Sequence, residues 1–106
     1  MIFLNKDAKL VNALPGLTRK TLATSQSLMI CEFNFEAHVE IPIHSHPHEQ
    51  VGYLVEGRVE MTIDGKKYDL KKGDSYCAPS NVPHGVLTLE PSLIIDTFCP
   101  PREDYR

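Results

Sequence analysis

Three histidines stand at every second position of one short stretch, IPIHSHPHEQVGYLVEG, which covers residues 41–57. They are His44, His46 and His48, and Gln50 continues the same spacing. Imidazole is the most common protein ligand for first-row divalent metals, and residues two apart on a strand point to the same side of it. The spacing therefore indicates a metal site, with a hydrogen-bonded core histidine or a solvated strand edge as the structural alternatives.

Pro47 interrupts this ladder of histidines. Proline has no amide hydrogen and is confined to strand edges, strand starts or bulges. If the alternation breaks at Pro47, His46 and His48 face different ways, and one of the three histidines lies beside the site. A zincin motif is excluded because Gly52 stands where its second histidine is required, and no serine lies in a nucleophile elbow.

The elements that must position these side chains have the period of β-strands. The alternating runs that we expect to be strands cover residues 18–24, 27–35, 51–57, 59–70, 84–89 and 92–98. Within 59–70, Asp64-Gly65 is a strong two-residue hairpin signal. No segment of 11–18 residues shows a helical period, so the sequence predicts an all-β sandwich or barrel with at most a turn of helix at either end.

Composition narrows the classes of partner. The chain has 106 residues, the length of one domain, and its 11 basic and 14 acidic residues are scattered and give a net charge of −3. Nucleic acid is an unsuitable partner for such a surface. No stretch is apolar enough to be a membrane span or a secretory signal, so we expect a cytoplasmic protein with no membrane partner. Cys31, Cys77 and Cys99 are expected to be reduced, buried thiols.

Two segments together resemble the sequence motifs of the cupin superfamily. They are HSHPHEQVGYLVEG at 44–57 and GDSYCAPSNVPH at 73–84, and the resemblance extends over about 30–100. It implies one cupin domain over 1–106, a double-stranded β-helix (jelly-roll) barrel whose core covers about 18–99.

The resemblance also implies a set of metal ligands. In cupins the two histidines and the glutamate of the first motif, with the histidine of the second, hold one metal ion. The corresponding residues here are His44, His46, Gln50 and His84. The chain departs from the usual motifs in having Gln50 for glutamate, Asn81 for a frequent glycine and Thr88 for a frequent asparagine.

The glutamine changes the electrostatics of such a site. Three neutral imidazoles and an amide leave the full charge on a divalent ion, whereas a carboxylate would offset one unit of it. We therefore expect a stronger Lewis acid, a lower metal affinity and a preference for an anionic substrate. Nitrogen and oxygen ligands with open positions suit one divalent transition metal, which is Zn, Ni, Mn, Co or Fe.

The end of the chain extends the resemblance to one group of cupins. With the two motifs, DTFCPPRED is similar to the pectin-degradation (KdgF-like) proteins, which convert 4,5-unsaturated monouronates from pectin or alginate breakdown into linear ketonized sugars. The resemblance implies that Asp96, Phe98 and Arg102 reach into the metal cavity. The structural alternative is an aspartate satisfied by turns and an arginine on the surface.

The chemistry of that reaction suits these residue types. Opening the ring hemiacetal leaves an enol that must become a ketone, so protons move twice. Asp96 is the candidate acid/base, Arg102 the clamp for the substrate carboxylate, and Phe98 a wall against the sugar face. Strand alternation places Tyr53 opposite Gln50, which favours a packing role.

Other functions and partners remain open at this point. His48 is a candidate to support a ligand or relay a proton. The rival functions are a non-catalytic metal- and small-molecule-binding cupin, and a metal-dependent dioxygenase acting on a diketone or thiol. We also expect a homodimer, because a small barrel leaves sheet edges and an apolar outer face that need cover.

Overall fold

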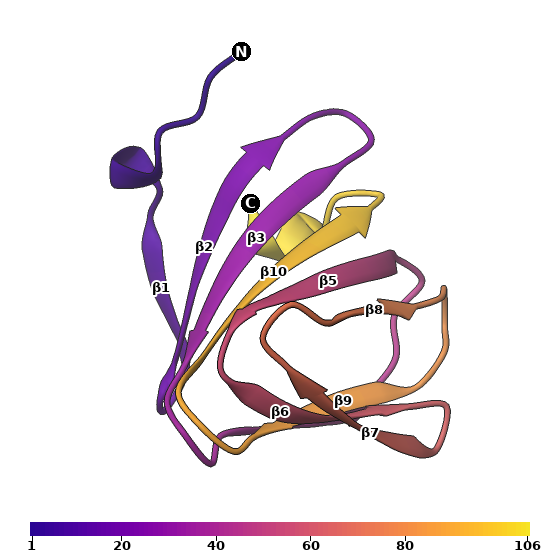
Figure 1. The fold of residues 1–106 in the computed structure, drawn as a ribbon. Helices are drawn as coiled ribbons and strands as arrows, with labels where there is room; N and C mark the ends of the chain where they lie inside the picture. Colours follow the sequence, from indigo (N-terminus) through magenta and orange to yellow (C-terminus); the bar gives the residue numbers. More distant parts are fainter.

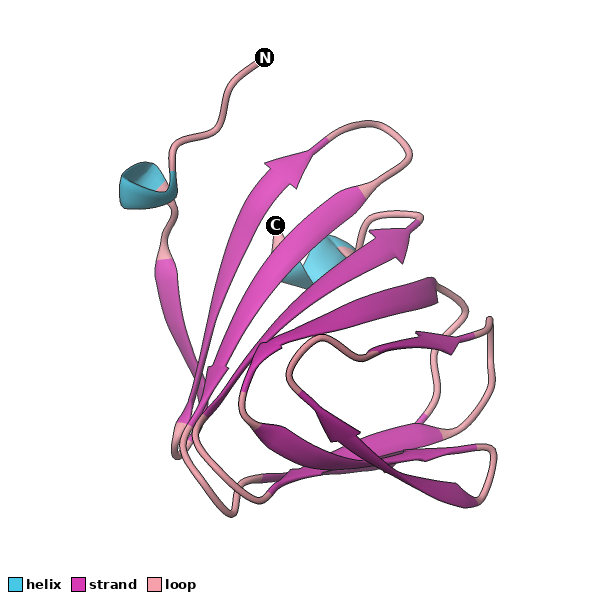
Figure 2. Cartoon of the chain, viewed as in Figure 1, coloured by secondary structure: helices cyan, strands magenta, loops and turns pink.

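Antiparallel strands make up almost all of the regular secondary structure in the computed structural model, which describes residues 1–106 (Figure 2). The strands are β1 (Leu10–Leu14), β2 (Leu17–Thr24), β3 (Met29–Phe35), β4 (Glu40–His44), β5 (Glu49–Glu56), β6 (Arg58–Ile63), β7 (Lys66–Lys71), β8 (Ser75–Ala78), β9 (His84–Thr88) and β10 (Ser92–Cys99). The only helices are two single 3-10 turns, η1 (Asn5–Asp7) and η2 (Glu103–Tyr105). Neither is long enough to cross a bilayer. The all-β prediction is confirmed.

The strands form two sheets that face each other (Figure 1). The larger sheet has the order β1-β2-β3-β10-β5-β8, and the smaller has the order β4-β9-β6-β7. The chain crosses between the sheets repeatedly, so β5 and β10 of the larger sheet are separated in sequence by strands of the smaller one. This arrangement is the predicted jelly roll, and it encloses a space between the sheets.

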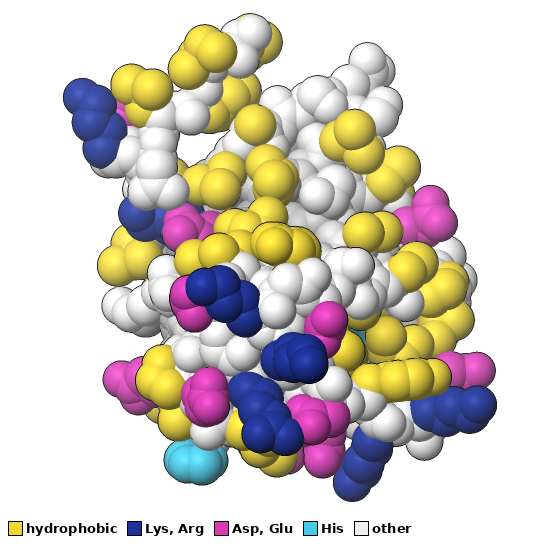
Figure 3. All heavy atoms as spheres, viewed as in Figure 1, with side chains coloured by type: hydrophobic (Ala, Val, Ile, Leu, Met, Phe, Trp, Pro, Cys, Tyr) yellow, Lys and Arg dark blue, Asp and Glu magenta, His cyan; other side chains and the backbone are white.

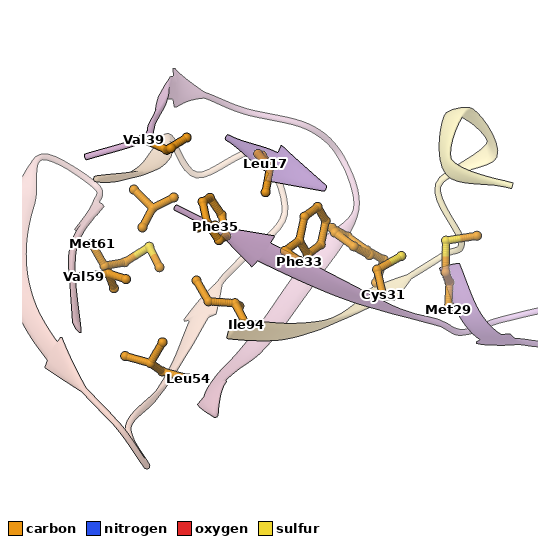
Figure 4. Close-up of a cluster of buried hydrophobic side chains, with 12 residues drawn as sticks. Leu17, Met29, Cys31, Phe33, Phe35, Val39, Leu54, Val59, Met61 and Ile94 are labelled. Atoms are coloured by element: carbon orange, nitrogen blue, oxygen red, sulfur yellow. The ribbon is translucent and has the colours of Figure 1, made fainter. Parts of the chain in front are cut away.

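The apolar core fills most of that space. Alternate residues of β3 and β10 point inward, and the side chains that line the core from both sheets are shown in Figure 4. On β10 the buried residues are Ser92, Ile94, Asp96 and Phe98. On β6 the buried face is made by Val59 and Met61. A polar residue at an inward position of such a core, as Asp96 is, requires partners there.

The hairpin predicted at Asp64-Gly65 joins β6 and β7. Both turn residues have positive φ angles, 51° and 79°, which is the conformation of a type I′ turn. Three strands were not predicted: β1, β4 and β8. Each has only four or five residues, and β4 contains Pro42, so their local patterns are weak signals.

Two cupin-motif positions are explained by backbone conformation. Gly57 has φ +102°, and a Cβ atom there would overlap Ser92 Oγ and lie 2.5 Å from the carbonyl oxygen of Pro91. Asn81, which replaces a frequent glycine, has φ +65°. Asparagine tolerates this left-handed region better than most residues, so the replacement keeps the same turn.

The prediction of three buried thiols was correct only for Cys31. Cys77 and Cys99 are exposed, and all three cysteines are free. The reason is strand phase: Tyr76 and Phe98 point inward, so the cysteines next to them along β8 and β10 point outward.

Candidate functional site

Three histidines from different segments meet at one end of the space between the sheets. One ring nitrogen from each of His44, His46 and His84 lies within 4.8 Å of the other two. His44 and His84 are paired neighbours on β4 and β9, with ring centroids 4.5 Å apart. The ring of His46 lies 4.9 Å from that of His84. The structure thus brings together the three histidines that the cupin resemblance implied as ligands.

The hydrogen bonds of the triad determine which nitrogen of each ring is free. Nδ1 lies 2.8 Å from a backbone carbonyl oxygen in His44, 3.0 Å in His46 and 2.9 Å in His84. A carbonyl oxygen only accepts, so each Nδ1 carries the hydrogen. Burial lowers the pKa of both His46 and His84, which favours neutral rings. Their Nε2 atoms therefore present lone pairs, and that of His84 is buried without a partner.

Gln50 completes the donor set. Its Oε1 atom lies 3.0 Å from His46 Nε2. In a neutral His46 whose Nδ1 is protonated, Nε2 is an acceptor, so two acceptors face each other across this short distance. That arrangement is favourable when a cation lies between them. The four residues therefore fit a divalent metal ion by the chemistry of their atoms, and backbone anchoring of Nδ1 is the usual support for a metal-binding histidine.

The histidine ladder is not one strand. β4 ends at His44 and β5 begins at Glu49, so the alternation breaks at Ser45, before Pro47. His46 reaches the triad from the connecting segment. His48 lies outside the triad, with its ring packed edge-on against that of His46 at 5.4 Å.

Asp96 lies close to this cluster, inside the barrel. It is 5% exposed on β10 and accepts a hydrogen bond from the hydroxyl of Tyr76. Burial raises the pKa of the Asp96 carboxyl to about 7, although hydrogen bonds from Tyr76 and Gln50 act in the opposite direction. A carboxyl group with such a pKa is suited to both release and uptake of a proton near neutral pH.

Sequence reasoning missed Tyr76. Its hydroxyl bridges two predicted site residues, since it donates to Asp96 and accepts from Gln50 Nε2 at 2.8 Å. Burial and the nearby Asp96 carboxylate raise the pKa of Tyr76 well above its usual value, so the hydroxyl keeps its hydrogen. The local sequence around Tyr76 carries no sign of this role, because its partners lie on other strands.

Arg102 approaches the cavity from the C-terminal segment. Its guanidinium carbon lies 5.5 Å from the ring centroid of Phe98 and 4.1 Å from that of Tyr105. The guanidinium donates two hydrogen bonds to the Asp104 carboxylate, at 3.3 Å and 3.1 Å. Tyr105 is a second residue that sequence reasoning missed, and it holds Arg102 by stacking. Tyr53, by contrast, lies on the outer face, 48% exposed, as strand alternation predicted.

One cavity joins these groups. Its volume is about 60 Å³, and residues of both sheets and the C-terminal segment line it. Its polar lining consists of His44, Gln50, Tyr76, His84, Asp96 and Arg102. Candidate metal ligands, a carboxyl group and a guanidinium thus share one small space.

Comparison with known proteins agrees with this fold. The cupin domain family matches residues 31–98. The chain is 40% identical over 92 residues to the pectin degradation protein KdgF of Dickeya dadantii, an alignment that covers 85% of this chain and 84% of that protein. It is 35% identical over 65 residues to the H2HPP isomerase of Bacillus subtilis, covering 59% of this chain and 28% of the isomerase.

Solved structures agree over nearly the whole chain. The structure of KdgF from a Halomonas species matches with a TM-score of 0.94 at 36% identity, covering 100% of this chain and 98% of that one. An RmlC-like cupin from Shewanella frigidimarina also matches with a TM-score of 0.94, at 33% identity, covering 99% of this chain and 95% of that one. With the family match and these two superpositions, the chain belongs to the cupin family, as its two motifs predicted.

Proposed function

We propose that this protein is a metal-dependent enzyme that converts 4,5-unsaturated monouronates from pectin or alginate breakdown into linear keto sugars. One observation carries the proposal. Two histidines of a three-histidine cluster, a buried carboxyl group and an arginine line the same cavity, in a chain 40% identical to a pectin degradation protein over most of its length. The net reaction is an isomerisation, so it needs a proton-transfer group and charge stabilisation but no redox partner.

The proton movements suit Asp96. The anomeric hydroxyl of the sugar loses its proton, the bond between C1 and the ring oxygen breaks, and C1 becomes an aldehyde. The ring oxygen is left as the enolate oxygen on C5, and protonation of C4 turns it into the C5 ketone. One carboxyl group can serve both steps, taking the proton from the hydroxyl and returning it to C4. The raised pKa of Asp96, about 7, suits this double role.

Charge determines how the substrate is held. A divalent metal bound by His44, His46, Gln50 and His84 would act as a Lewis acid toward the sugar oxygens. Arg102 binds the substrate carboxylate with the two donors that now contact Asp104. Phe98 lies beneath the guanidinium and covers the inner face of the sugar. Because the cavity accommodates only a few water-sized groups, the reacting atoms enter it and the rest of the ring lies at its mouth.

The test is an assay with freshly generated unsaturated galacturonate, followed by the loss of its ultraviolet absorbance. We expect the wild-type protein to exceed the spontaneous rate. Asp96→Ala, Arg102→Ala and a chelated sample should lose 100-fold or more of the enzymatic rate, on the order of a general acid–base contribution. Asp69→Ala and Arg58→Ala are matched controls, because these residues form an exposed ion pair on the outer surface.

The outcomes of this assay separate the rival functions. If the wild type, both site variants and the chelated sample all match the spontaneous rate, the uronate proposal is wrong. Tight uronate binding without turnover would point to a non-catalytic binding cupin. Turnover of a diketone or thiol that requires Fe(II) and oxygen would point to a dioxygenase.

We also propose that the protein is a homodimer of the cytoplasm. The support for association is apolar surface: hydrophobic side chains gather over the upper part of the face shown in Figure 3, and the N-terminal arm that stands away from the sheet is apolar. Large hydrophobic side chains that are exposed in the single chain include Met1, Ile2, Phe3, Leu4, Leu28, Val51 and Tyr53. Two exposed free thiols suit a reducing compartment. We expect light scattering to give a molar mass twice that of the chain. A monomer mass at all protein concentrations would refute the dimer.

A further inference from the structure

Tyr76, Gly52 and Asp96 form one rung across three neighbouring strands of the larger sheet. Gly52 of β5 is paired with Tyr76 of β8 on one side and with Asp96 of β10 on the other. Glycine has no side chain, so the Tyr76 ring crosses over β5 and reaches the Asp96 carboxylate. A Cβ atom on Gly52 would overlap both Tyr76 Cε1 and Asp96 Oδ1. The glycine is therefore what allows this contact between strands that are not neighbours.

The hydrogen bonds along this rung have a direction. A tyrosine hydroxyl has one hydrogen, and that of Tyr76 is given to Asp96. The hydroxyl must then accept from its second partner, Gln50, whose Nε2 lies 2.8 Å away. Because the amide group is planar, presenting the NH₂ to Tyr76 turns Oε1 of Gln50 toward His46 Nε2. The Tyr76 hydroxyl thus favours the amide orientation in which Oε1 faces the histidines, and the Asp96 carboxyl, which also accepts from Gln50, favours the same orientation.

We propose that Tyr76 is a positioning residue that orients the Gln50 amide so that its oxygen, and not its NH₂ group, faces the metal position. The inference deepens the proposed function and rests on the same metal site. It also explains why a glutamine there needs a partner. The two ends of an amide have opposite hydrogen-bonding character, and only the oxygen binds a cation, whereas both oxygens of a carboxylate can do so.

The experiment compares metal binding in three variants. The probe is Co²⁺, whose visible absorption spectrum reports its ligands and whose affinity is measured by titration. We expect Tyr76→Phe to bind Co²⁺ about 10-fold more weakly, which is the usual loss of metal affinity when a residue that hydrogen-bonds a ligand is removed. Its Co²⁺ spectrum should match that of Gln50→Ala. Tyr53→Phe is the matched control, because it removes a hydroxyl from an exposed tyrosine of the same sheet, and it should keep the wild-type spectrum and affinity.

Three further variants, Gln50→Glu, Gln50→Glu with Tyr76→Phe, and Gly52→Ala, separate loss of amide orientation from general damage to the fold. In a Gln50→Glu background, Tyr76→Phe should change the Co²⁺ affinity by less than about 2-fold, because a carboxylate needs no orienting partner. Gly52→Ala keeps every polar group but removes the space for the Tyr76 ring, so it should give the spectrum of Tyr76→Phe. Circular dichroism confirms that each protein is folded before its titration is compared.

The inference is overturned if Tyr76→Phe keeps the wild-type Co²⁺ spectrum and affinity, or if its loss of affinity is the same with Gln50 and with Glu at position 50. Uronate kinetics add an independent readout: kcat should fall 10-fold or more while KM changes less than about 3-fold, since Arg102 is untouched. The metal experiments need no substrate. A wild type that fails to act on the uronate while the Co²⁺ results hold therefore refutes the proposed function and leaves the role of Tyr76 standing.

Discussion

At the scale of single residues, the candidate metal site depends on the tautomers of three histidines. Each Nδ1 is hydrogen-bonded to a backbone carbonyl, so the main chain holds the rings in place and leaves each Nε2 as the candidate ligand atom. The carbonyl that anchors His46 belongs to His48. His48 thus supports the triad through its backbone, and its side chain contributes only packing against the ring of His46.

The contrast between the triad histidines, whose side chains are candidate ligands, and His48, which contributes a backbone carbonyl, predicts how substitutions affect metal binding. His44→Ala and His84→Ala each remove a free Nε2, and we expect metal affinity to fall by more than about 100-fold, beyond the usual cost of losing a supporting residue. His48→Ala keeps the backbone carbonyl and should stay within about 3-fold of wild type. Calorimetric titration with Zn²⁺ measures all three, and a larger loss for His48→Ala than for His84→Ala would contradict this ligand set.

Asp96 predicts a pH dependence of stability in the metal-free protein. Its pKa is raised by burial from 3.8 to about 7, so between these values the folded state holds a proton that the unfolded state releases. The contribution of Asp96 to the free energy of unfolding is therefore greatest below about pH 4. It is lost as the pH rises toward 7, by up to about 1.4 kcal/mol per pH unit.

Asp96→Asn should abolish that contribution. The measurement is urea unfolding of chelated protein from pH 4 to 8, and the difference between the two proteins isolates Asp96 from the histidines. Asp64→Asn is the control, since the side chain of Asp64 is exposed in a turn that also suits asparagine. A constant difference between wild type and Asp96→Asn across this pH range would refute the raised pKa.

At the scale of elements, short connections and strand phase place the site. The segment between β4 and β5 has only four residues, so His44 and His46 lie on opposite sides of a sharp break yet still meet. The turn after β5 is equally constrained. Gly57 combines a positive φ angle with close contact to Pro91 and Ser92, which precede and begin β10.

Alanine substitutions at Gly57 and Gly73 separate two destabilising effects of a side chain at such a turn. One is the unfavourable backbone conformation, and the other is steric overlap with neighbouring atoms. Gly73→Ala should cost about 1 kcal/mol, because its φ of +95° is unfavourable for alanine but no atom lies within 4 Å of the added Cβ. Gly57→Ala carries the same backbone cost and a steric overlap, so we expect about 3 kcal/mol. Urea unfolding of both variants is the measurement, and equal costs would show that the β10 contact does not matter.

At the scale of the whole molecule, a bound metal would link distant parts of the chain. Its candidate ligands come from β4 and β9 of the smaller sheet, from the segment that joins β4 to β5, and from β5 of the larger sheet. Only the folded barrel brings these residues together. Metal binding should therefore stabilise the fold as a whole.

Thermal unfolding measures this coupling. Free metal at 100 times its Kd should add about 2.7 kcal/mol to the free energy of unfolding. For a domain of this length that raises Tm by on the order of 10 °C, and a chelator should reverse the shift. His84→Ala should show no shift, whereas an equal shift in His84→Ala would place the metal elsewhere.

Local sequence was sufficient to predict much of the fold. The β6–β7 hairpin was predictable because Asp64-Gly65 determines its turn within two residues. Strand β8 was not, since it has only four residues and is held as a strand by pairing with β5. The exposure of Cys77 follows from the same pairing, because the register with β5 determines which residues of β8 face the core.

The sequence by itself determined the kind of chemistry: histidines and an amide at cupin spacing, an aspartate near the end of the chain, and an all-β barrel around them. The tertiary structure decided which side chains meet. It broke the histidine ladder at Ser45 and brought Tyr76 across Gly52 to Asp96. Periodicity reports which face of a strand a residue occupies, but contacts across a sheet depend on strand order and register. These are set by pairing between segments far apart in the chain.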